Sequence, residues 1–100
     1  MQNLSPKEYL VLDLLRAGGQ KYGLEMVRES PGLKRGTIYV LLDRMTDKGL
    51  VSSVQEKNPS QPGLPRRLYS ITGQGAVTLR AQEVFAAEMA GSGAEGYEVL

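Results

Sequence analysis

Residues 33–51 constrain the fold of this chain most, because their apolar side chains repeat first with the period of a helix and then with that of a strand. The apolar positions follow i, i+3, i+4 and i+7, the spacing of one buried helical face, and are Ile38, Leu41, Leu42 and Met45. Gly49 suits the end of such a helix, since glycine adopts positive φ without steric cost. The stretch predicts a helix over about 35–48 with one packed face.

The opposite face of this helix is small and basic near its start. Its outward line and flanks, with the two residues before them, are Lys34, Arg35, Gly36, Thr37, Tyr39, Val40, Asp43, Arg44 and Asp47. A short helix with such a face suits the major groove of DNA. Taken alone, the stretch favours an ordinary amphipathic helix with a solvated outer face, and the flanking segments change this interpretation.

The segment before this helix predicts two further helices. Ser5 can cap a helix over about 6–16, with Pro6 at its first position and Glu8 completing a capping box. The expected buried face of that helix is Leu10, Val11, Leu14 and Leu15. A small edge strand at 20–22 and a helix at about 23–30 follow, with Leu24, Met26 and Val27 as core candidates. Two helices joined by a short turn predict a helix-turn-helix, although many small helical domains share this pattern.

The segment after the helix makes the prediction more specific. Residues 50–56 and 66–71 are expected to form strands, and the loop 57–65 between them holds three prolines and a glycine. A β-hairpin directly after a helix-turn-helix is the wing of a winged helix. Lys57, Arg66 and Arg67 are then expected on the same side as the 35–48 helix.

A last helix is expected from the cap Thr72 onward. It carries an apolar stripe that one small domain does not need, made of Val77, Ala81, Val84, Phe85 and Met89. Leu79 lies off this stripe and is expected to pack on the domain. The expected fold is mainly α with a small β-hairpin wing. It divides into a DNA-binding domain (1–72), a C-terminal dimerisation helix (73–90) and a flexible tail (91–100).

Composition excludes several classes of function. The 100 residues include no Cys and no His, so the commonest nucleophile, general base and metal ligands are missing. We therefore expect no enzyme, no metal and no cofactor. No apolar run is long enough for a membrane span, and we expect a cytoplasmic protein. Residues 34–67 hold seven basic and three acidic residues, a net charge of +4, whereas the whole chain is +1. A local basic patch indicates a polyanion site, although small proteins also show such fluctuations by chance.

Four separate motifs resemble the PadR family of bacterial transcriptional regulators across roughly residues 5–80. They are Tyr22–Glu25, Gly36–Leu42, Gly49–Val51 and Arg66–Gly75. The resemblance implies a dimeric winged-helix repressor on an inverted-repeat operator. It implies base contacts from the 35–48 helix, phosphate contacts from the wing and dimerisation through the last helix.

The chain departs from the family pattern in three respects. Arg35 and Val40 stand where members usually carry proline. The C-terminal region is short, which places the chain closer to the small branch of the family. Drug-binding members of that branch use a tryptophan at the dimer pore, and this chain has no Trp. A small-molecule effector is therefore compatible with the resemblance but has no support from the residues.

The leading hypothesis is a sequence-specific regulator that binds double-stranded DNA as a homodimer. Its expected contacts are Lys34, Arg35, Gly36, Thr37, Tyr39, Val40, Arg44, Lys57, Arg66 and Arg67. Arg44 is compatible with a guanine edge or a phosphate, and Tyr39 with a phosphate contact or with half-buried packing. The alternative is a winged-helix module whose basic face binds an acidic protein.

Overall fold

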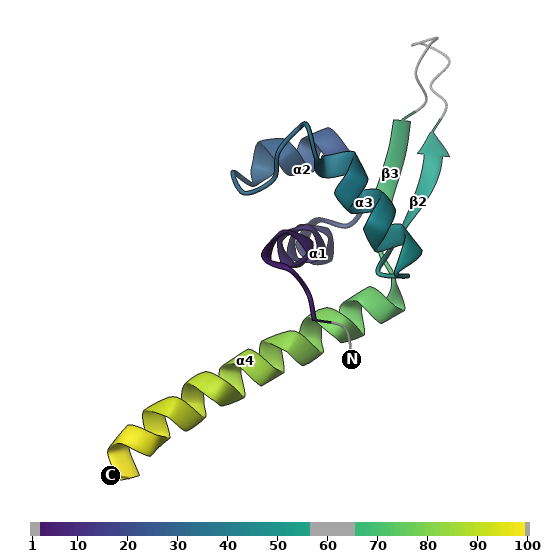
Figure 1. The fold of residues 1–100 in the computed structure, drawn as a ribbon. Helices are drawn as coiled ribbons and strands as arrows, with labels where there is room; N and C mark the ends of the chain where they lie inside the picture. Colours follow the sequence, from purple (N-terminus) through teal and green to yellow (C-terminus); the bar gives the residue numbers. More distant parts are fainter. Residues whose placement is uncertain (1–2, 57–65, 100) are drawn as a thin grey trace.

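The computed structural model describes residues 3–56 and 66–99, with side chains up to residue 90. Its elements follow the order α1 (Pro6–Gly18), β1 (Lys21–Tyr22), α2 (Gly23–Glu29), α3 (Ile38–Asp47), β2 (Val51–Glu56), β3 (Arg66–Ile71) and α4 (Gly73–Val99). Figure 1 shows α1, α2 and α3 gathered beside the small sheet, with α4 leaving this body as a long rod. The predicted winged helix, mainly α with a hairpin wing, is confirmed.

The sheet is antiparallel, in the order β1-β3-β2. β3 lies in the middle, with Tyr22 of β1 opposite Leu68 and Ser53 of β2 opposite Tyr69. The predicted edge strand and both predicted wing strands are confirmed. The wing loop 57–65, Lys57 included, lies outside the described residues.

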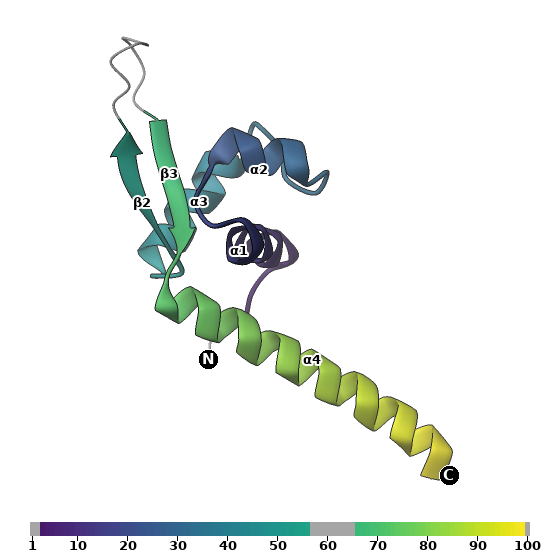
Figure 2. The same cartoon turned by 180° about the vertical axis from the view of Figure 1, so that it is seen from behind.

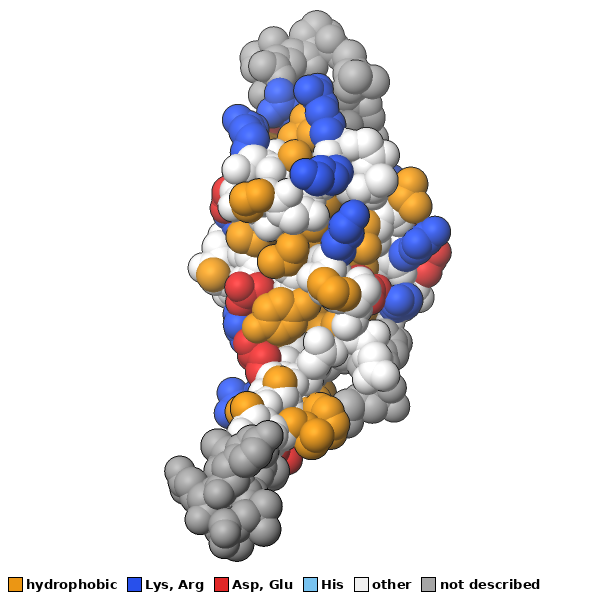
Figure 3. Space-filling model, turned by 60° about the vertical axis from the view of Figure 1, so that its left-hand side comes forward, with side chains coloured by type: hydrophobic (Ala, Val, Ile, Leu, Met, Phe, Trp, Pro, Cys, Tyr) orange, Lys and Arg blue, Asp and Glu red, His pale blue; other side chains and the backbone are white. Residues whose placement is uncertain are grey.

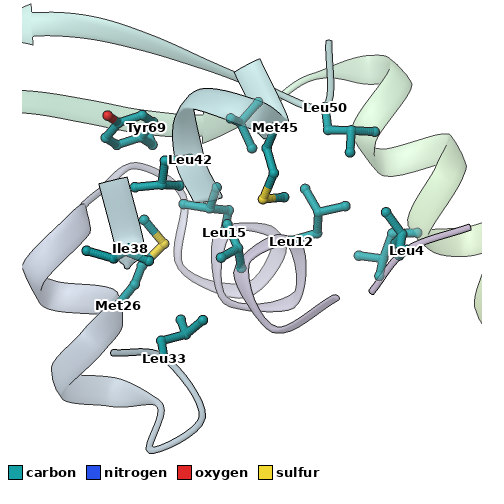
Figure 4. Close-up of a cluster of buried hydrophobic side chains, with 13 residues drawn as sticks. Leu4, Leu12, Leu15, Met26, Leu33, Ile38, Leu42, Met45, Leu50 and Tyr69 are labelled. Atoms are coloured by element: carbon teal, nitrogen blue, oxygen red, sulfur yellow. The ribbon is translucent and has the colours of Figure 1, made fainter. Parts of the chain in front are cut away.

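One apolar cluster fills the space between the helices and the sheet (Figure 4). Its members are Leu4, Val11, Leu12, Leu15, Met26, Leu33, Ile38, Leu42, Met45, Leu50, Val51, Tyr69 and Leu79. The face predicted for α1 was partly wrong, because Leu12 is fully buried whereas Leu10 and Leu14 are only partly buried. In α2, Met26 is buried, and Leu24 and Val27 are partly exposed.

The start predicted for the third helix was also wrong, because α3 begins at Ile38 rather than near residue 35. The backbone N–H groups of Thr37 and Ile38 both donate to the Lys34 carbonyl, at 3.2 and 3.0 Å, which closes a turn ahead of the helix. Thr37 itself has φ −125° and ψ −9°, outside the helical region. At the other end, Gly49 follows the helix with φ +77°, as predicted.

Side-chain caps join the helices to their neighbours. Ser5 and Glu8 form the predicted capping box of α1, and the Lys48 ammonium lies 2.7 Å from the second Glu8 carboxylate oxygen. Burial of Glu8 opposes its ionisation, but hydrogen bonds from Lys48 and the Ser5 N–H outweigh it and hold the pKa of Glu8 below its ordinary value. Thr72 accepts a 2.9 Å hydrogen bond from the Gly75 N–H, confirming it as the cap of α4.

The first turns of α4 close the core, and the rest of the helix leaves the body. Leu79 is fully buried, as predicted. Gln82 accepts a hydrogen bond from the Leu4 N–H at 2.8 Å, and Glu83 accepts one from the Tyr9 hydroxyl at 2.7 Å. Arg16 also pairs with Glu83, and its guanidinium, with the Tyr9 hydroxyl, lowers the pKa of Glu83 to about 2. These contacts anchor α4 to α1.

The backbone of α4 continues as helix to Val99, beyond the end predicted at residue 90. Figure 2 shows this part extending away from the body with no other element beside it. The division at residue 90 and the mobility of residues 91–100 stay predictions. Among the helices that the structure describes, none combines the length and apolar character that crossing a bilayer needs.

Candidate nucleic-acid interface

The turn before α3 presents four predicted contact residues to solvent. Leu33 and Ile38 are buried on either side of it and fix its two ends to the core. The exposed residues between them are Lys34, Arg35, Gly36 and Thr37. The structure therefore places the charges of Lys34 and Arg35, the backbone of Gly36 and the hydroxyl of Thr37 just before the N-terminal end of α3. Of these, Arg35, Gly36 and Thr37 had been predicted inside the helix.

The outward face of α3 continues this surface. Val40 is 54% exposed and Arg44 is exposed. Leu42 and Met45, on the inward face of the same helix, are completely buried. The predicted helical phase is correct. Asp43 and Asp47 lie on the same outer face and are exposed, so the positive charge is concentrated at the start of the helix rather than along it.

Tyr39 combines exposure with packing. Its side chain is 48% exposed, yet a Cβ placed on Gly23 would lie only 3.0 Å from the Tyr39 ring carbon Cε1. Gly23 thus allows the ring to lie against the start of α2. The half-buried packing that the sequence left open is present. A phosphate contact by the hydroxyl stays a prediction.

Arg66 and Arg67 begin β3 at the base of the wing, and both are exposed. The Arg67 guanidinium donates a 3.1 Å hydrogen bond to the Ser53 hydroxyl of β2. The Arg66 guanidinium carbon lies 5.5 Å from the centre of the Tyr22 ring, within the range of a cation–π contact. The two neighbouring arginines therefore have different surroundings.

Two residues at the base of the wing were missed in the sequence. The Tyr22 hydroxyl donates a 2.6 Å hydrogen bond to the Glu56 carboxylate, which raises the pKa of Tyr22. Tyr22 had been recognised only as part of an edge strand and a family motif. Glu56 carried no signal of its own, because the contact depends on how β1 and β2 flank β3.

Charged and hydrophobic side chains are unevenly distributed over the face drawn in Figure 3. Lys and Arg side chains, in blue, gather in the upper part of this view, below the grey wing tip. Hydrophobic side chains, in orange, accompany α4 in the lower part. The exposed large residues of the predicted stripe are Val77, Val84, Phe85 and Met89, while Ala81 is partly buried. Within residues 3–56 and 66–90, no group of three or more acidic side chains lies close enough together to hold a metal ion.

Comparison with known proteins agrees with this geometry. Residues 11–81 match the model of the transcriptional regulator PadR-like family. Comparison with curated proteins gives no match. Among solved structures, a PadR-like transcription factor from Bacteroides fragilis is similar at a TM-score of 0.78 and 25% identity, covering 89% of this chain and 87% of that one.

Two further solved structures show the same fold. A PadR family transcriptional regulator from Eggerthella lenta has a TM-score of 0.73 and 26% identity over 94% of this chain and 83% of that one. Bacillus subtilis PadR in complex with operator DNA has a TM-score of 0.70 and 24% identity. The match covers 82% of this chain but only 49% of that one. With a family model matching most of its length, the chain belongs to the PadR-like family of transcriptional regulators, which are DNA-binding regulators rather than enzymes.

Proposed function

We propose that this protein is a dimeric, sequence-specific repressor that binds an inverted-repeat operator. In this proposal α3 enters the major groove and the wing lies along the sugar–phosphate backbone. Lys34, Arg35 and Arg67 supply positive charge to phosphates, and Val40 touches a thymine methyl group. Repression, as opposed to activation, follows the family resemblance and is part of the proposal, as is a cytoplasmic location.

One observation carries the proposal. The outward face of α3 is uncovered by the rest of the described chain, and its N-terminal end is bordered by an exposed basic turn. A helix that enters the major groove needs an open face with cationic groups near its start and the wing beside it. Bacillus subtilis PadR, which shares the fold, has been solved in complex with operator DNA, and this supports the same docking here.

The dimer in this proposal forms through α4. Phe85 is 61% exposed, and Val84 and Met89 beside it are exposed as well, so these large side chains of the stripe have no cover within residues 3–56 and 66–90. A two-fold pairing of α4 with a second copy is the simplest way to bury it. Such a dimer would place two copies of α3 on successive half-sites of one DNA face.

The experiment is a fluorescence-anisotropy titration of labelled duplex DNA at several salt concentrations. The logarithm of the affinity should fall by roughly 0.9 per phosphate contact for each unit of log salt, and a dimer with several contacts gives a steep slope. Retained binding with a flat response would contradict a basic DNA-contacting surface. Absence of DNA binding, together with capture of an acidic protein that duplex DNA does not displace, would favour the protein-interaction module instead.

A further inference from the structure

The two arginines at the start of β3 point to opposite faces of the sheet. Successive side chains of a strand alternate between its faces, so residues two apart share one face. Tyr69 is buried in the core beside α3 (Figure 4), which puts Arg67 on the α3 side. Arg66 shares the other face with Leu68. Both arginines were predicted as DNA contacts from the sequence, whereas the fold places them on different faces of the sheet.

On the α3 side, Arg67 lies among residues of the proposed DNA-binding face. Its guanidinium bonds to Ser53, which stands directly opposite Tyr69 in the sheet. Burial raises the pKa of Tyr69, as does the nearby negative charge of Asp43 on the outer line of α3, and the positive charge of Arg67 opposes them. Arg67 and α3 therefore lie on the same face of the sheet.

On the opposite face, Arg66 belongs to a group that joins all three strands. Tyr22 of β1 donates to Glu56 of β2 at 2.6 Å, and Arg66 of the central strand β3 lies over the Tyr22 ring. Glu56 is also the direct partner of Arg66 in the strand register. β2 ends at Glu56 and β3 begins at Arg66, so this group sits at the end of the hairpin where the wing loop leaves the sheet.

Resting on the proposed function, we infer that the two arginines have different tasks. Arg67 contacts the DNA backbone, whereas Tyr22, Glu56 and Arg66 form a wing clamp that holds the hairpin at the angle in which Arg67 reaches the phosphates. A two-stranded hairpin is only marginally stable by itself, and the third strand β1 supports it for just two residues. The clamp fixes the hairpin by side-chain contacts beyond that short strand. Tyr22 and Glu56 are positioning residues in this account.

The test compares single variants of the full chain on a short duplex of random sequence, by fluorescence anisotropy over a salt series. Arg67→Ala removes one phosphate contact from each protomer, so the slope of log affinity against log salt should fall by about 1.8 per dimer. Arg66→Ala and Tyr22→Phe loosen the hairpin but keep Arg67, which still reaches the phosphates once the hairpin is ordered on the DNA. That ordering costs free energy but changes no phosphate contact, so both variants should lower the affinity several-fold at every salt concentration and leave the slope unchanged. Tyr22→Phe keeps the aromatic ring under Arg66 and removes only the hydroxyl.

Glu56 gives a matched pair of variants. Glu56→Gln keeps an oxygen that accepts from the Tyr22 hydroxyl, and Glu56→Ala does not. Both remove the same negative charge, so their general effect on DNA attraction cancels in the comparison. The glutamine variant should bind DNA several-fold more tightly than the alanine variant. Circular dichroism of every variant at the titration temperature separates this effect from loss of fold.

Equal slope losses in Arg66→Ala and Arg67→Ala would overturn the division of tasks, and so would wild-type affinity in Tyr22→Phe. In either case the wild-type protein still shows salt-dependent DNA binding, and the proposed function stands. A wild-type protein without salt-dependent binding would overturn the proposed function and this inference together.

Discussion

The winged-helix body and the distal half of α4 are both rich in apolar side chains, yet they differ in whether those side chains are covered. In the body, thirteen hydrophobic residues are buried in one cluster, and Leu79 is the member furthest along the chain. Glu83 joins α4 to the body through its hydrogen bond with Tyr9 and its ion pair with Arg16. Directly after it, Val84 and Phe85 are exposed, and Met89 follows one turn later.

This difference separates a region that buries its own apolar side chains from one that leaves them exposed. In the proposed function, the exposed stripe pairs with a second copy of the chain. Exposed apolar groups that stand singly are common on protein surfaces, but a contiguous stripe indicates an interaction site. All thirteen residues of the buried cluster precede the distal half of α4. We therefore expect variants of the body to change stability, and variants of the distal helix to change assembly and operator binding.

The largest expected effect comes from Phe85→Asp, which puts a charge without a partner into the proposed dimer contact. The variant should sediment as a monomer at micromolar concentration and keep the far-ultraviolet dichroism of the body. Loss of the second half-site should lower operator affinity by about 10²- to 10⁴-fold. Ala87→Asp adds the same charge to another face of the helix and should remain dimeric. A dimeric Phe85→Asp with normal binding would place dimerisation elsewhere, such as at α1.

The next effect concerns the point where α4 joins the body. A Cβ on Gly75 would lie 2.1 Å from the carbonyl oxygen of Leu50, and backbone atoms there cannot move aside without disturbing the core. Gly75→Ala should cost about 2–3 kcal/mol in the free energy of unfolding measured with urea. Gly73→Ala meets nothing within 4 Å and should be neutral or slightly stabilising. Equal stabilities of the two variants would mean that α4 is not tightly seated on Leu50.

A smaller effect within the body is its dependence on pH through Glu8. Since folding lowers the pKa of Glu8 below 4.5, its contribution to stability is complete above that pH and is lost as the pH falls through the folded-state pKa. Glu8→Gln keeps a capping-box acceptor but loses the Lys48 ion pair. It should be less stable than wild type by about 1 kcal/mol at neutral pH. Urea unfolding should show this difference shrinking as the pH is lowered below 4.5, and a constant difference would contradict the account.

Much of this fold could be predicted, because its signals are local. Both wing strands, the capping box of α1 and the outward line of α3 follow from short-range spacing and turn residues. The start of α3 could not be placed, since the turn at Lys34–Thr37 depends on a buried Leu33 that fixes the chain to the core.

The wing clamp was missed for a related reason. Tyr22 and Glu56 are 34 residues apart, and only the strand order β1-β3-β2 brings them together. The alternation that separates Arg66 from Arg67 was visible in the sequence, but which face belonged to the core was not. Contacts that depend on the arrangement of distant segments leave no pattern in one sequence.

The smallest expected effect on stability is that of Val40→Ser. Val40 is half exposed on the outer face of α3, so the free energy of unfolding should stay within about 0.5 kcal/mol of wild type. The variant should instead change the preferred base at one position of each half-site, because an apolar contact with a thymine methyl is lost. Leu42→Ser, at a fully buried position of the same helix, should destabilise the body strongly and serves as the control. A large loss of stability in Val40→Ser would show that Val40 contributes to the core.

The most direct test of the account is selection of bound sites from a random pool of duplex DNA, performed with the wild-type chain. If two bodies each place α3 in a major groove and α4 joins them, the selected sites should form an inverted repeat. The half-site centres should lie about 10 base pairs apart, or a multiple of that distance. Recovery of no enriched sequence, or of a single half-site without a symmetric partner, would contradict a dimeric sequence-specific regulator.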